Sequence, residues 1–175
     1  MIFLIFSELI LLVILVLASI NFFNIVFRGF APFFAANSQV INLATDNIKP
    51  TKDQVVYELG AGTANFLKAV EAKYPETKLI GIEYSLFTYL RTKAKLKALQ
   101  SKIELRREDL YQTNLSDASI VYCYLIPTMM PKLSEKIQKE CHKGTVIISY
   151  IFSIPGLSMR KTIQTKGGNI YFYEV

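Results

Sequence analysis

From residue 54 onward, short apolar runs alternate with longer segments that have helical periodicity. Strands are predicted at residues 54–59, 78–83, 103–107, 119–124 and 145–152, and helices at residues 64–73, 85–99 and 129–141. Helices between successive strands favour a mostly parallel sheet that is covered on both faces. The last two predicted strands, 160–164 and 169–175, flank Lys166-Gly167-Gly168 and read as an antiparallel hairpin. The alternation therefore predicts one α/β domain that ends in a hairpin.

The N-terminal segment is apolar on all sides and contains a single charged residue. That residue is Glu8, within the stretch Met1–Phe27. About 20 apolar residues suffice to cross a bilayer as a helix. No basic residue precedes Arg28, and Ala18-Ser19-Ile20 is a poor cleavage site, so a cleaved signal peptide and a buried helix are the weaker alternatives. We expect an uncleaved transmembrane helix at residues 1–27.

The basic residues predict how this helix is oriented. Arg28, Lys49 and Lys52 follow the segment and none precedes it, which places the rest of the chain on the cytoplasmic side of a single-pass membrane protein. Residues 28–52 read as a connector with a short helix, capped by Asn37 or Ser38, and residues 53–175 as the main domain. The net charge of +6 favours contact with anionic lipid rather than with nucleic acid.

A glycine turn follows the first predicted strand of the main domain. The strand runs into Gly60-Ala61-Gly62, and a helix is predicted just beyond. Without β-carbons the backbone can turn tightly and a ligand can approach it closely. The second strand ends at Glu83, which lies 21 residues past Gly62 and can accept hydrogen bonds from both hydroxyls of a ribose. These residues predict a site for a cofactor that contains a nucleoside.

Two residues beside the turn discriminate between cofactors. Asn65 stands where a dinucleotide site has its third glycine, and Glu58 lies two residues before the turn. A carboxylate at that position would repel a pyrophosphate and attract the ammonium group of a methionine. The residues therefore favour S-adenosylmethionine, with a nicotinamide-dependent oxidoreductase as the alternative.

Together with Asp109 in Arg107-Glu108-Asp109-Leu110, these motifs resemble those of class I, Rossmann-like methyltransferases. The resemblance implies a Rossmann-like fold that binds S-adenosyl-L-methionine. It implies that the first motif holds the methionine part, that the acid ending the second strand holds the ribose, and that the aspartate contacts the adenine. The implied cofactor-binding residues are Glu58, Gly60, Ala61, Gly62, Asn65, Glu83, Tyr84, Asp109 and Leu110.

A narrower resemblance is to the FAM173 group of membrane-anchored protein-lysine methyltransferases, which has mitochondrial members and prokaryotic relatives. It is carried by the leading apolar helix, by residues 29–33, by residues 124–130 and by Ile148-Ser149-Tyr150 with Pro155. The chain departs from the group at Thr63-Ala64, where glycine and aspartate are usual. The resemblance implies methyl transfer to a protein lysine, at the mitochondrial membrane if the source is eukaryotic.

Few residues in the sequence indicate how the methyl acceptor is bound or activated. Tyr124, at the end of the fourth strand, is the candidate catalytic residue, and we find no dedicated base. No metal site is expected, because His142 stands alone beside a turn and Cys123 and Cys141 read as core residues. A lipid or a small molecule stays open as the methyl acceptor. A non-catalytic membrane scaffold with this fold is the alternative of a different class.

Overall fold

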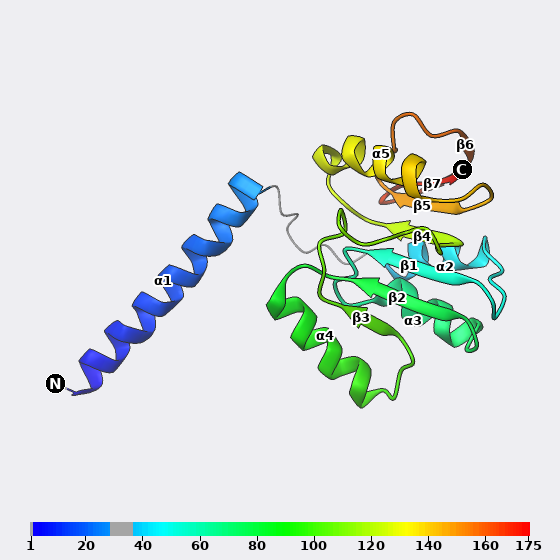
Figure 1. Cartoon of the computed structure of the whole chain (residues 1–175). Helices are drawn as coiled ribbons and strands as arrows, with labels where there is room; N and C mark the ends of the chain where they lie inside the picture. Colours follow the sequence, from blue (N-terminus) through cyan, green and yellow to red (C-terminus); the bar gives the residue numbers. More distant parts are fainter. Residues whose placement is uncertain (1, 29–36) are drawn as a thin grey trace. The chain divides into compact units, whose positions relative to one another are not determined.

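The computed structural model describes residues 2–28 and 37–175, with side chains at 6–17, 19–20 and 37–175. The chain divides into two compact units, Met1–Phe34 and Ala35–Val175. The described part of the first unit is helix α1 (Ile2–Arg28) (Figure 1). Within the described residues, none of the helices combines the length and the apolarity needed to cross a membrane. The motif at residues 29–33 lies outside the described residues.

The second unit is built on a seven-stranded sheet with the order β3-β2-β1-β4-β5-β7-β6 (Figure 1). The strands are β1 (Val55–Leu59), β2 (Lys78–Ile82), β3 (Glu104–Arg106), β4 (Ile120–Cys123), β5 (Val146–Tyr150), β6 (Met159–Thr165) and β7 (Gly168–Glu174). Strands β1 to β5 pair in parallel, whereas β7 is antiparallel to both β5 and β6. The predicted α/β, Rossmann-like sheet with a C-terminal antiparallel hairpin is confirmed.

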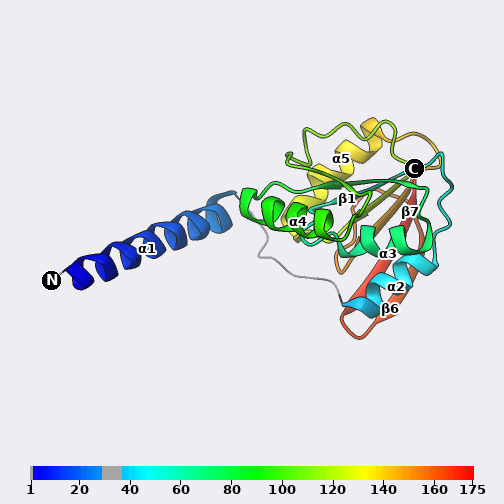
Figure 2. The same cartoon turned by 90° about the horizontal axis from the view of Figure 1, so that it is seen from below.

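Helices cover both faces of this sheet (Figure 2). They are α2 (Ser38–Asp46), α3 (Asn65–Lys73), α4 (Leu86–Ala98) and α5 (Met130–Glu140), and a short 3-10 helix, η1 (Pro127–Met129), precedes α5. One buried cluster joins α2, α3 and Leu96 of α4 to the sheet, and a second joins α5 to the opposite face. Asn37 caps α2 as expected, since its side-chain oxygen accepts a hydrogen bond from the Gln39 amide at 3.0 Å.

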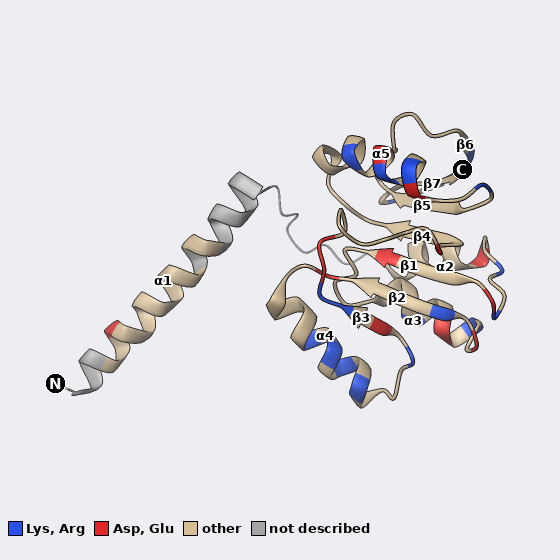
Figure 3. Cartoon of the chain, in the orientation of Figure 1, with Lys and Arg blue, Asp and Glu red and all other residues tan. Residues whose placement is uncertain are grey.

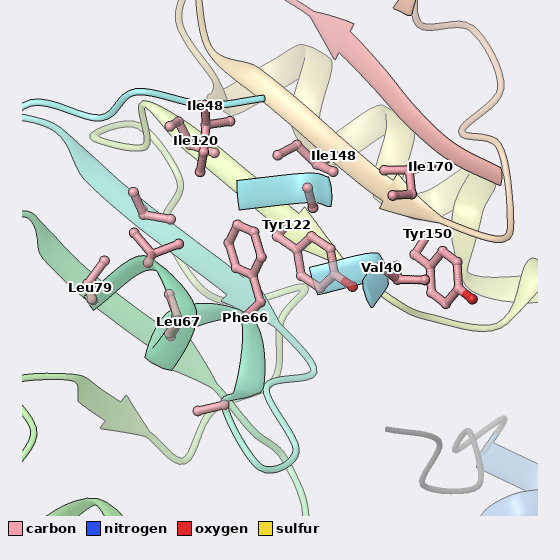
Figure 4. Packing of buried hydrophobic residues seen from close by; sticks show 14 of the residues in the cluster. Val40, Ile48, Phe66, Leu67, Leu79, Ile120, Tyr122, Ile148, Tyr150 and Ile170 are labelled. Atoms are coloured by element: carbon pink, nitrogen blue, oxygen red, sulfur yellow. The ribbon is translucent and has the colours of Figure 1, made fainter. Parts of the chain in front are cut away.

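The core beneath α2 and α3 is apolar and aromatic (Figure 4). Phe66 of α3 stacks on Tyr122 of β4 with ring centroids 4.1 Å apart. Burial of a large apolar side chain of this kind stabilises a domain by about 1.5–3 kcal/mol. The stack therefore holds the first turn of α3 firmly against the centre of the sheet.

The strand order contains a point, between β1 and β4, where the direction of winding reverses. From β1 the chain proceeds outward through β2 and β3, whereas β4 and β5 lie on the other side of β1. The neighbouring strands β1 and β4 thus mark the point where the direction of winding reverses. In parallel sheets of this type, ligands bind beyond the carboxyl ends of the strands at that point. The glycine turn after β1 lies there.

Candidate active site

The turn after β1 has a backbone that suits glycine. Gly60 has a φ of +71° and Gly62 a φ of +53°, both in the left-handed region. The Ala61 amide donates a hydrogen bond to the Ile82 carbonyl at 2.8 Å, which ties the turn to the end of β2. Asn65 begins α3 directly after the turn. The positive φ angles explain why glycine occupies both positions of the tight turn, and the approach of a ligand to this turn stays a prediction.

Glu83 is held against this turn. One of its carboxylate oxygens accepts a hydrogen bond from the Gly62 amide at 2.9 Å, and the other accepts one from the Ser85 amide at 2.8 Å. The side chain is partly exposed. The structure thus brings together the acid that ends β2 and the glycine turn that ends β1, although they are 21 residues apart in the sequence. Each oxygen retains acceptor capacity for a hydroxyl group.

Glu58 is buried, and its environment changes its charge. A carboxylate oxygen accepts a hydrogen bond from the Leu67 amide of α3 at 3.2 Å. Burial raises the pKa of Glu58 from its ordinary value of 4.5 to about 8, although the amides of Leu67 and Phe66 and the charge of Lys68 oppose that rise. The carboxyl group is therefore mostly protonated at pH 7. A cation placed beside it would lower this pKa and ionise it.

We expect cofactor binding to release a proton from Glu58. If the methionine ammonium faces this residue, the wild-type protein should release close to one proton at pH 7, and Glu58→Gln should release none and bind more weakly. The measurement is calorimetry with S-adenosylhomocysteine in buffers of different ionisation enthalpy. Equal proton release by the two proteins would contradict this placement of Glu58.

The same pKa makes the free domain sensitive to pH. The folded state keeps a proton that the unfolded chain has released between pH 4.5 and about 8, so this group makes stability fall as the pH rises through that window. Glu58→Gln should remove this slope.

The remaining predicted cofactor-binding residues come after β2 and β3, at the carboxyl ends of these strands. Tyr84 is exposed directly after Glu83, and Leu110 is buried. The Glu83 amide donates to the Arg106 carbonyl at 3.0 Å, which joins the ends of β2 and β3. Asp109 accepts a hydrogen bond from the Tyr111 amide at 2.9 Å, so its carboxylate stabilises the local turn. Its contact with adenine stays a prediction.

Three tyrosines lie on the other side of the glycine turn, at the ends of β4 and β5. Tyr124 and Tyr150 meet edge to face with ring centroids 4.8 Å apart. Tyr122 is the register partner of Glu58, and its hydroxyl is buried with no hydrogen-bond partner among the described residues. Burial raises the pKa of Tyr122 and of Tyr124, so both hydroxyls stay protonated and can donate.

Sequence reasoning named Tyr124 but missed Tyr122. The available signal was strand alternation, because residues two apart on a strand share a face. Tyr122 therefore points to the same side of the sheet as Tyr124, toward α3. Its buried hydroxyl marks a polar position beside Glu58.

No group of three or more histidine, cysteine, aspartate or glutamate side chains that could hold a metal occurs in the part of the chain that the structure describes. His142 faces the Thr145 hydroxyl at 3.0 Å near the start of β5. Both cysteines are buried, and burial raises the pKa of Cys123 to about 12 and that of Cys141 to about 11. These thiols are core residues, as expected.

Comparisons with known proteins identify the fold and the family. The model of the ANTKMT methyltransferase domain matches residues 58–161, which is more than half of the chain. A protein-lysine N-methyltransferase from Saccharolobus islandicus is 21% identical over 150 residues, covering 82% of this chain and 93% of the relative.

Solved structures of methyltransferases have the same fold as this chain. An RNA methyltransferase from Salinibacter ruber, in complex with S-adenosyl-L-homocysteine, superposes with a TM-score of 0.76 at 20% identity, covering 81% of this chain and 94% of that one. A precorrin-6y C5,15-methyltransferase from Geobacter metallireducens gives a TM-score of 0.65 at 14% identity, covering 81% and 89%. The chain belongs to the ANTKMT methyltransferase domain family and is a class I, Rossmann-like methyltransferase that depends on S-adenosylmethionine.

Proposed function

We propose that this enzyme transfers a methyl group from S-adenosylmethionine to the side chain of a protein lysine. The observation that carries the proposal is the similarity to a protein-lysine N-methyltransferase over 93% of that relative's length. The family match establishes methyl transfer, and Tyr124 and Tyr150 beside the glycine turn offer walls for an acceptor.

The order of the strands suggests how the cofactor lies. Along the carboxyl edge the successive strand ends carry Asp109 after β3, Glu83 after β2, and the glycine turn after β1. These would hold the adenine, the ribose and the methionine part respectively. The activated methyl group would then face the ends of β4 and β5. In this arrangement Tyr124 and Tyr150 border the acceptor.

When bound, S-adenosylmethionine supplies a methyl group on a positively charged sulfur. The chain must align the acceptor with that methyl group and exclude water. A lysine attacks only in its neutral form, and an aromatic, poorly solvated pocket lowers the pKa of an ammonium group. Tyr124 and Tyr150 supply such walls, and the Tyr122 hydroxyl supplies a donor beside Glu58. The lysine would lose its proton to water before it enters the pocket. Its nitrogen would then bond to the methyl carbon as the carbon–sulfur bond breaks, and neutral S-adenosylhomocysteine would leave.

The substrate class can be tested with a labelled methyl group. Membranes that contain the full chain are incubated with S-adenosylmethionine labelled in its methyl carbon, and then separated into protein and lipid. We expect the label in protein, as methylated lysine after acid hydrolysis, and not in membranes that contain Gly60→Val. Label in the lipid fraction would indicate a lipid methyltransferase, and no label in either fraction a non-catalytic scaffold.

We further propose that the N-terminal segment holds the enzyme in a membrane. Supporting this, the apolar side chains described on α1 are more than half exposed to solvent over almost their whole length, from Phe6 at 63% to Ile20 at 53%. A helix with apolar side chains on all sides is unfavourable in water unless lipid or protein covers it. By the positive-inside rule, the basic residues that follow the segment favour a cytoplasmic position for the main domain, which we propose as part of the same arrangement.

We expect alkaline carbonate to leave the full-length protein in the membrane pellet. A chain that starts near Ala35 lacks the apolar segment and should appear in the supernatant. The measurement is immunoblotting of both fractions, with a known peripheral protein as a reference. Full extraction of the intact chain would rule out the proposed anchor.

A further inference from the structure

Helix α4 has apolar side chains on two opposite faces. Its inner face buries Thr92 and Leu96. On the outside, Leu86 is 50% exposed, Phe87 77% and Leu90 54%. At about 100° per residue these three share a side with Ala94 and Ala98, opposite the buried face. We call the five residues Leu86, Phe87, Leu90, Ala94 and Ala98 the outer face of α4.

Cations surround this outer face. Arg91, Lys93, Lys95 and Lys97 are exposed on α4, and Figure 3 shows that its C-terminal half is basic. No acidic residue occurs between Glu83 and Glu104. None of the four cations forms a salt bridge with any residue that the structure describes. The amine of Lys93 donates to the Tyr89 hydroxyl at 2.7 Å and lies 5.1 Å from the centroid of that ring, so these contacts pair it with no acidic side chain.

We propose that the outer face of α4 docks on an anionic lipid bilayer. A helix with exposed apolar residues and flanking cations suits the boundary between headgroups and acyl chains, where the apolar residues insert and the cations meet lipid phosphates. The uniformly positive charge argues for an anionic surface in particular.

The docking face is tied to the candidate active site. The Thr92 hydroxyl on the inner side of α4 donates to the Gly62 carbonyl at 2.6 Å, and Glu83 accepts a hydrogen bond from the amide of Ser85, the N-cap of the helix. A bilayer under α4 would thus lie next to the glycine turn. The acceptor would be a group presented at the membrane surface. This docking does not depend on the N-terminal anchor, since α4 carries its own apolar and basic residues.

The absence of tryptophan from the chain provides a direct test. Phe87→Trp places a single fluorophore on the outer face of α4. Met159→Trp is the matched control. Met159 is 52% exposed on β6, the edge strand at the far end of the sheet from β3, which α4 contacts. Both full-length proteins are reconstituted in vesicles of phosphatidylglycerol with brominated acyl chains, which quench fluorophores that reach them. Methyl transfer by both variants is measured in parallel.

We expect strong quenching of the Phe87→Trp protein and none of the Met159→Trp protein. Quenching should fall in neutral brominated phosphatidylcholine, and also when Lys93→Gln and Lys97→Gln are added to Phe87→Trp. If the Phe87→Trp protein is quenched no more than the control, lipid does not cover α4, and its outer face meets a protein or another part of this chain. Retained methyl transfer with that result would overturn the docking alone and leave the proposed function standing.

Discussion

Replacing Gly60 with valine is expected to abolish cofactor binding while the domain stays folded. Gly60 has a φ of +71°, which costs a side chain that carries a β-carbon about 1–2 kcal/mol. A β-carbon there would come within 2.8 Å of the buried Leu125 side chain, so the turn would have to shift, and with it the backbone predicted to meet the methionine part. We expect an affinity loss of at least about a hundredfold for S-adenosylhomocysteine, equivalent to about 3 kcal/mol.

Gly144→Val is the matched control for the backbone strain. Gly144 has a φ of +92°, and nothing lies within 4 Å of a β-carbon built there. It precedes β5, at the opposite edge of the sheet from the glycine turn. The control should lose only the stability that the backbone strain costs, which is less than Gly60→Val loses, and should keep wild-type affinity in calorimetry. Wild-type affinity in a folded Gly60→Val protein would refute the site.

Glu83→Ala should weaken cofactor binding by roughly tenfold to a few hundredfold. The carboxylate would make two charge-assisted hydrogen bonds to the ribose hydroxyls, each worth about 1.5–3 kcal/mol, and water would compensate in part. The substitution also removes the acceptor for the Gly62 and Ser85 amides, so the turn loses a support. Both effects act in the same direction on affinity, which is measured by calorimetry with S-adenosylhomocysteine.

The control for a general charge effect is Glu76→Ala. Glu76 is 74% exposed in its side chain and pairs with Lys102 at 3.2 Å, in the loop that precedes β2. It should bind like the wild type, since an exposed ion pair contributes little. If Glu83→Ala and Glu76→Ala bind equally well, the carboxylate does not hold the ribose.

Most of the domain could be predicted from the sequence, because its central strands are buried and its helices are regular. The apolar run 145–152 predicted β5, which forms at Val146–Tyr150, and the predicted helix 129–141 forms as α5 at Met130–Glu140. Both elements are one or two residues shorter than predicted at each end, whereas the strand predicted at 160–164 is longer and forms as β6 at Met159–Thr165. The glycine turn was predictable because backbone positions with a positive φ favour glycine.

Other properties arise only from the folded arrangement. The sequence analysis treated Glu58 as a charged carboxylate. Its protonation at neutral pH follows from its burial under α3, which only the folded structure shows. Asp109 was predicted to contact adenine, yet its hydrogen bond to the Tyr111 amide depends on a turn that the sequence did not specify. The exposure of Leu86, Phe87 and Leu90 beside the lysines of α4 became apparent only once the buried face of that helix was known.

The most direct test of the account is a paired titration of the wild-type protein with S-adenosylhomocysteine and with NADH. Glu83 beside the glycine turn suits a ribose, and the protonated Glu58 gains a favourable charge pair only when a cation such as an ammonium group lies beside it. We expect saturable binding of one S-adenosylhomocysteine per chain, lost in Gly60→Val, and no binding of NADH. Saturable binding of NADH by the wild-type protein, lost in Gly60→Val, with no binding of S-adenosylhomocysteine, would contradict this expectation.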